Sequence, residues 1–123
     1  MEKQKDLLNN LNEKTSLGEL QEYIKKVIKI RGFSDKNLQE EMLLLLEETG
    51  ELAKAIRKRL PSGTIDKNKI DNYTAIEEEI ADIFIVLTNI CNLLEIDLYK
   101  AIIEKEKINV ERNGLKINKK DAV

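Results

Sequence analysis

Residues 40–55 read EEMLLLLEETGELAKA, an apolar run that passes without a break into a group of acidic residues. Residues three or four apart lie one above the other on a helix. One such line along the predicted helix is formed by Leu44, Glu48, Glu51 and Ala55. A lone carboxylate driven into a core costs several kcal/mol unless something compensates its charge. This stretch therefore predicts an amphipathic helix. It also requires something that compensates the negative charge of its acidic residues.

A second segment, residues 79–93, has the same pattern and indicates how the negative charge could be compensated. Its line of residues is Glu79, Asp82, Val86, Ile90 and Leu93. Two antiparallel helices would bring the two acid pairs to one level. Oxygen ligands without nitrogen or sulfur suit a hard cation, Mg²⁺ or Mn²⁺. The chain contains no histidine, which rules out a histidine-ligated zinc site and the Glu-x-x-His di-iron site of other helical bundles.

Most glutamate-rich helical runs are solvated faces, and this ordinary interpretation applies to Glu77 and Glu78. Four acidic residues differ from these because they are in register with the apolar stripe of their helix. They are the predicted metal ligands, Glu48, Glu51, Glu79 and Asp82. Glu47 lies about a hundred degrees round the helix from Glu48. For Glu47 a solvated position and a role beside the metal both stay open.

Start and stop signals divide the chain into helices. Ser16 and Glu19 have the spacing of a capping box, and so do Thr74 and Glu77. Gly32 is expected to end the first main helix, and Asp97 is expected to cap the last. The main helices are predicted at about residues 17–31, 38–60, 74–94 and 97–113. Residues 61–73 are polar and aperiodic, which predicts a loop.

These elements predict one all-α domain over residues 1–123, built as a four-helix bundle. Residues 1–14 are expected to hold a short extra helix at most, and residues 115–123 to be frayed. The run IFIVLTNICNLL at 83–94 is apolar nearly all round and predicts the most buried helix. The apolar faces of this helix and of 38–60 are too wide for one neighbour each. We therefore expect a homodimer or homotetramer to complete the bundle.

Composition excludes several classes of function. The net charge is −2 and aromatic residues make up 4% of the chain, so no polymeric nucleic acid is expected as a partner. No apolar run approaches the ~18 residues of a membrane-spanning helix, and the N-terminal stretch lacks the apolar core of a signal peptide. Cys91 is the single cysteine and is expected to be a small buried apolar residue in a reducing, cytoplasmic compartment.

The paired acids resemble the motif of the MazG-like, all-α nucleoside triphosphate pyrophosphohydrolases. That motif is E-x-x-E followed after a variable gap by E-x-x-D, and here it reads ETGE at 48–51 and EIAD at 79–82. The surrounding LLEETGELAKAI resembles the family's second helix. The stretch EEIADIFIVLTNICNLLEIDLYKAI resembles its third helix and the turn into the fourth. The resemblance covers about residues 17–112.

A further likeness lies in the last helix, where the family carries the pattern K-x-x-x-N-x-x-R. The chain has KEKINVER there, which aligns Lys105, Asn109 and Arg112 with substrate-binding positions. IRGF at 30–33 resembles the segment before the second helix and makes Phe33 a candidate to stack on the base. A place in the apolar core stays open as the alternative for this residue. The tryptophan that many relatives place nearby is absent from this chain.

The resemblance implies that an NTP or dNTP is hydrolysed to its monophosphate and pyrophosphate with Mg²⁺, a reaction that cleans nucleotide pools. Mn²⁺ is a possible substitute for Mg²⁺. The implied catalytic residues are Glu47 and Glu48, one of which orients or deprotonates the attacking water. Two alternatives stay open: a helical bundle that binds a divalent ion without catalysis, and a helical interaction module whose acids only look like the motif.

Overall fold

The computed structural model describes residues 2–32, 37–60 and 76–121, and this part of the chain is entirely helical. Its five helices are α1 (Glu2–Asn9), α2 (Leu17–Ile30), α3 (Leu38–Arg59), α4 (Ile76–Leu93) and α5 (Leu98–Asp121). The predicted all-α fold class is confirmed, and α1 is the short extra helix expected near the N-terminus.

The helix caps predicted at Ser16 and Asp97 are present. The Ser16 hydroxyl accepts a hydrogen bond from the Glu19 backbone N–H at 3.0 Å, and the Glu19 side chain accepts one from the Ser16 N–H. Gly32 follows α2 with φ +80°, a conformation that glycine adopts without steric cost. The Asp97 carboxylate accepts from the Lys100 N–H at 3.1 Å and so caps α5.

One predicted helix end differs from the structure, and several predicted features lie outside the described residues. α5 was predicted to stop before Gly114, but it continues to Asp121. A glycine inside a helix costs only about 1 kcal/mol relative to alanine, which flanking helix formers can offset. Phe33, Thr74 and the loop predicted at 61–73 lie outside the described residues.

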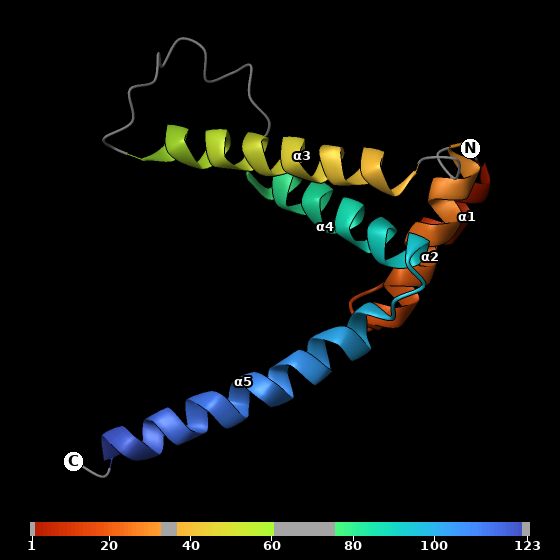
Figure 1. Cartoon of the computed structure of the whole chain (residues 1–123). Helices are drawn as coiled ribbons and strands as arrows, with labels where there is room; N and C mark the ends of the chain where they lie inside the picture. The colour runs from red at the N-terminus through yellow and green to blue at the C-terminus, as the bar shows by residue number, and fades with distance from the viewer. Residues whose placement is uncertain (1, 33–36, 61–75, 122–123) are drawn as a thin grey trace.

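Helices α3 and α4 form an antiparallel pair that is the main body of the fold (Figure 1). α2 packs across the end of α4, and α1 packs on α2. The buried apolar residues are Ile24, Val27, Ala55, Val86, Ile90, Cys91 and Leu98. Three of these seven lie on α4, and a fourth, Leu98, begins α5. Burial raises the pKa of the Cys91 thiol. The prediction that α4 is the most buried helix is confirmed.

The Gln21 side chain fixes the junction between α4 and α5. Its amide nitrogen donates to Asn92 Oδ1 at 3.0 Å and to the Ile96 carbonyl at 2.8 Å, and its oxygen accepts from the Leu98 N–H at 3.0 Å. Asn92 returns a bond to the Gln21 carbonyl at 3.3 Å. These bonds hold the turn on α2, after which α5 diverges from the α3–α4 pair (Figure 1).

Much apolar surface stays exposed in the single chain. Leu43 and Leu46 on α3 are 66% and 64% exposed, and Val110 on α5 is 67% exposed. Within the described residues the helices do not close into a four-helix bundle, because α5 points away from the others (Figure 1). None of the helices described is both long enough and apolar enough to cross a bilayer.

Candidate functional site

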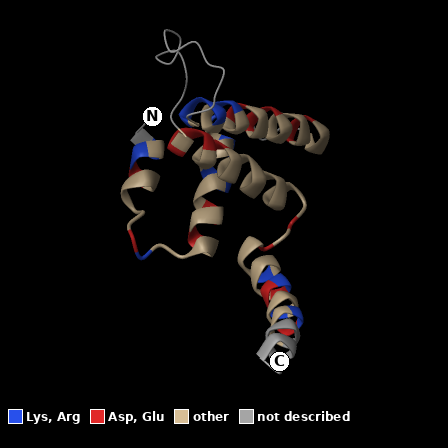
Figure 2. Cartoon of the chain, turned by 90° about the vertical axis from the view of Figure 1, so that its left-hand side faces the viewer, with Lys and Arg blue, Asp and Glu red and all other residues tan. Residues whose placement is uncertain are grey.

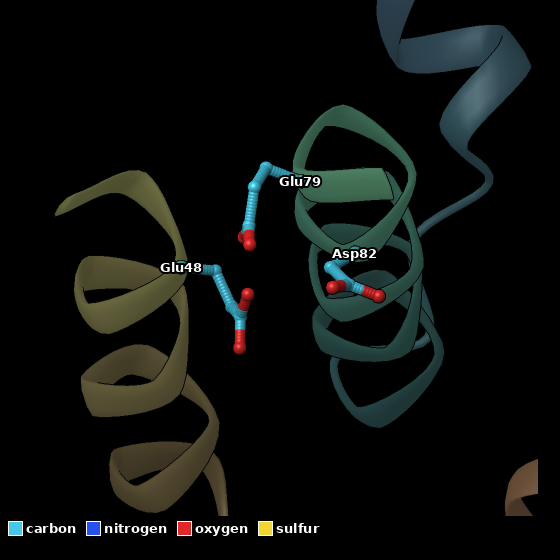
Figure 3. Close-up of side chains that lie close together, drawn as sticks. All are labelled: Glu48, Glu79 and Asp82. Carbon is cyan, nitrogen blue, oxygen red and sulfur yellow. The ribbon is translucent and has the colours of Figure 1, made fainter. Parts of the chain in front are cut away.

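Three of the predicted acidic ligands meet between α3 and α4. Glu48 projects from α3 toward Glu79 and Asp82, which project from the first two turns of α4 (Figure 3). One carboxylate oxygen of each residue lies within 4.8 Å of the other two. Glu79 and Asp82 share one face because they are three residues apart. The antiparallel packing predicted from the acid pairs thus brings them to a common level.

Burial separates Glu79 from the acids beside it in sequence. Glu79 is 3% exposed, whereas Glu77 and Glu78 lie on the solvated face as expected. Glu77 forms an ion pair of 3.6 Å with Arg59 at the end of α3. Figure 2 shows this basic last turn of α3 beside the acidic first turn of α4. The charges that surround the acid cluster are therefore of both signs.

The pKa of Glu48 is raised above its ordinary value. The largest cause is loss of hydration, followed by a side-chain hydrogen bond with Glu79 and by repulsion from Asp82, Glu79 and Glu47. Every one of these effects disfavours the charged form of Glu48. A cation bound among the three carboxylates would reverse the repulsion.

The donor set and its spacing fit a hard divalent cation. Each of the three residues offers an oxygen, the ligand atom that Mg²⁺ and Mn²⁺ favour. Oxygens on opposite sides of a Mg²⁺ ion lie about 4.2 Å apart, since each Mg–O bond is about 2.1 Å. The separations of up to 4.8 Å in the cluster need only small side-chain rotations to reach that geometry.

The other two acids predicted for the site lie at its edge. Glu51 follows Glu48 by about one turn of α3 and is exposed, and it is not part of the three-residue cluster. Glu47 is also exposed, yet close enough for its charge to raise the pKa of Glu48. The role of Glu51 as a metal ligand and the role of Glu47 as a catalytic base therefore stay predictions.

The predicted phosphate-binding residues lie on α5, away from the acids. Lys105 and Arg112 are exposed, and Asn109 donates from Nδ2 to Glu106 Oε2 at 2.6 Å. Because α5 diverges from α3 and α4, one chain does not bring these residues to its own acid cluster (Figure 1).

Two buried polar residues next to the cluster escaped the sequence reasoning. Glu41 on α3 is 3% exposed and Asn89 on α4 is 5% exposed. Each lies seven residues, or about two helical turns, from a cluster acid, Glu48 for the first and Asp82 for the second. This seven-residue offset was a usable signal, because residues two turns apart lie on nearly the same face.

The crowding of charge at Glu48 predicts an unusual effect of substitution. Glu48→Gln is expected to raise the melting temperature of the metal-free protein by a few degrees, because the amide keeps the size but removes the repulsion. The same substitution is expected to abolish any further rise when Mg²⁺ is added. Thermal melting with and without Mg²⁺ measures both effects, with Glu78→Gln on the solvated face as the control. A loss of stability in metal-free Glu48→Gln would contradict the description of the cluster.

The sequence matches a known protein family. Residues 36–112 match the MazG nucleotide pyrophosphohydrolase domain, and no curated protein matches the chain. The matched segment holds the acid cluster and also Lys105, Asn109 and Arg112. Since it covers more than half of the 123 residues, the chain belongs to the MazG nucleotide pyrophosphohydrolase family.

Proposed function

We propose that this member of the MazG family hydrolyses a nucleoside or deoxynucleoside triphosphate to the monophosphate and pyrophosphate. The observation that carries the proposal is the three-carboxylate cluster of Glu48, Glu79 and Asp82, which lies inside the family segment. Mg²⁺ is the proposed cation, with Mn²⁺ as a substitute, and the role is removal of unwanted nucleotides from the pool.

The proposed reaction breaks the anhydride bond between the α- and β-phosphorus atoms. A water oxygen bonds to the α-phosphorus, and pyrophosphate leaves with the bridging oxygen. The proposed cation ligands are Glu48, Glu51, Glu79 and Asp82. The cation supplies charge neutralisation on the phosphate oxygens and a defined position for the water. Glu47, or a Glu48 oxygen turned away from the cation, takes the proton that the water loses.

Positive partners for the phosphates are proposed to come from a second copy of the chain. The spacing of Lys105, Asn109 and Arg112 places them on one face of α5. That helix points away from the acid cluster of its own chain (Figure 1). The exposed Leu43, Leu46 and Val110 show that α3 and α5 both have apolar surface to bury. A homodimer, or a homotetramer made of two such dimers, would place α5 of one protomer against the α3–α4 pair of its partner.

The products identify the bond that breaks. Incubation of a panel of NTPs and dNTPs with Mg²⁺ is expected to yield the monophosphate and pyrophosphate, separated by chromatography. In ¹⁸O-labelled water the label is expected in the monophosphate, because the water attacks the α-phosphorus. Accumulation of the diphosphate would overturn the reaction. Absence of turnover together with a Mg²⁺-dependent rise in melting temperature would favour the non-catalytic metal-binding module instead.

A further inference from the structure

A small pocket lies beside the acid cluster on the α3–α4 pair. It has a volume of about 150 Å³ and is lined by Ile28, Arg31, Glu41, Leu44, Ile85, Val86 and Asn89. Its apolar lining with a few polar side chains is the composition typical of a ligand-binding site. The volume is below the ~300–1,000 Å³ of pockets that enclose a whole drug-sized ligand. The pocket therefore suits one part of a larger ligand.

The pocket is in register with the acid cluster. Leu44 precedes Glu48 by one turn of α3, and Val86 follows Asp82 by one turn of α4. Glu41 and Asn89 lie one further turn away, so the polar end of the pocket is about 10 Å from the level of the acids along α3. A ligand whose phosphates lie over the acids would thus direct its other end into the pocket.

The two polar residues are placed to recognise a hydrogen-bonding edge. Asn89 is 5% exposed, and its carboxamide makes no hydrogen bond to any residue in the described ranges 2–32, 37–60 and 76–121. Buried amides normally have partners, so a buried amide that faces a pocket without one indicates a ligand group. Glu41 is 3% exposed and faces the same pocket. A carboxylate has about four acceptor sites, so it can take a ligand donor in addition to a protein partner.

We propose that this pocket binds the nucleobase and selects a cytosine, a single ring that carries an exocyclic amino group. The inference rests on the proposed function, since it takes the acid cluster as the place of the phosphates. Glu41 accepts a hydrogen bond from the amino group, because a carboxylate offers acceptors and no donor. Asn89 donates to the ring nitrogen beside it. Leu44 and Val86 contact the faces of the ring.

The same geometry disfavours uracil. Uracil presents a carbonyl oxygen where cytosine has its amino group, and two oxygens without a proton between them repel each other. A site built to pair with a hydrogen-bond donor rejects an analogue that lacks this donor more strongly than an apolar pocket could.

Arg31 at the pocket edge donates from Nε to Gln4 Oε1 at 3.0 Å. This bond connects α1 to this end of the site.

Binding of products tests the pocket without any turnover. Protein labelled with ¹⁵N is titrated with CMP and with UMP, and the Asn89 side-chain amide signal is followed by NMR. That signal is assigned by its absence in Asn89→Asp. CMP is expected to shift it, and UMP is expected to shift it much less at equal concentration. Equal shifts, no shift at Asn89, or a shift by AMP in preference to CMP would overturn the proposal.

Turnover provides the second arm. The kcat/KM for CTP is expected to exceed that for UTP by at least about tenfold, and Glu41→Gln is expected to bring the ratio close to one. Glu40→Gln, the exposed neighbour on α3, is the matched control and should keep the wild-type ratio. An unchanged ratio in a folded Glu41→Gln would contradict the inference. Lack of hydrolysis of every triphosphate would instead contradict the proposed function, while the NMR arm would still be readable.

Discussion

Asp82→Asn is expected to abolish pyrophosphate release, with a loss in kcat of at least about a hundredfold. A carboxylate oxygen of Asp82 is within 4.8 Å of those of Glu48 and Glu79, so the substitution removes one of the negative charges proposed to hold the cation. Removal of a single group that stabilises transition-state charge typically costs ~10²–10³ in rate. The measurement is pyrophosphate release at saturating triphosphate and Mg²⁺.

Asp82→Asn also has an informative control on the same helix. Glu78→Gln makes the same change of charge on the solvated face of α4 and is expected to keep wild-type turnover. Melting curves separate loss of chemistry from loss of fold, because removal of a repelling carboxylate should leave the metal-free protein at least as stable. Full turnover in Asp82→Asn would remove this residue from the site.

Subunit mixing is expected to restore activity to two inactive variants. Lys105→Ala/Arg112→Ala is expected to lose about ten- to a hundredfold in kcat/KM for each charge-assisted contact with the phosphates. Asp82→Asn is expected to be inactive for the reason given above. If α5 acts on the acid cluster of the other protomer, a mixed dimer of the two variants contains one site with every residue intact. Random exchange in a dimer with two equivalent sites then yields about a quarter of wild-type activity.

The mixing experiment also decides how the phosphates are held. Light scattering on each variant establishes that a homodimer or homotetramer still forms, and a monomer at micromolar concentration would contradict the proposed assembly. An oligomer whose mixtures stay inactive would place Lys105 and Arg112 outside the partner's site. Unchanged kinetics in the double variant would remove α5 from substrate binding altogether.

The sequence was sufficient for the pairing of α3 with α4 because both helices carry the same kind of signal. Each has an apolar stripe that an acid pair continues, and a helix buries such a stripe against another apolar surface. Glu48, Glu79 and Asp82 came together for that reason. The caps at Ser16 and Asp97 were equally readable, since they depend on residues within one turn.

What the sequence did not reveal depends on contacts between distant segments. Glu41 looks like one more exposed glutamate in QEEM. Its seven-residue offset from Glu48 indicates the shared helix face, but its burial depends on the packing of α2, α3 and α4. Asn89 stands in the apolar run 83–94, whose pattern predicts a buried helix but does not indicate that this polar residue faces a pocket. The direction of α5 was also not predictable, because side-chain bonds between residues more than seventy positions apart determine it.

The Gln21 junction has a consequence for how proteins of this design can diverge. The direction of α5 is determined by a few amide hydrogen bonds from Gln21 and Asn92 to each other and to one turn, while the carboxylate cluster is positioned by α3 and α4. Substitutions at the junction would therefore redirect α5, and with it the proposed assembly, without touching Glu48, Glu79 or Asp82. Because α5 is proposed to carry Lys105 and Arg112 to the acid cluster of a partner, such substitutions would alter how the phosphates are held and leave the carboxylates themselves in place.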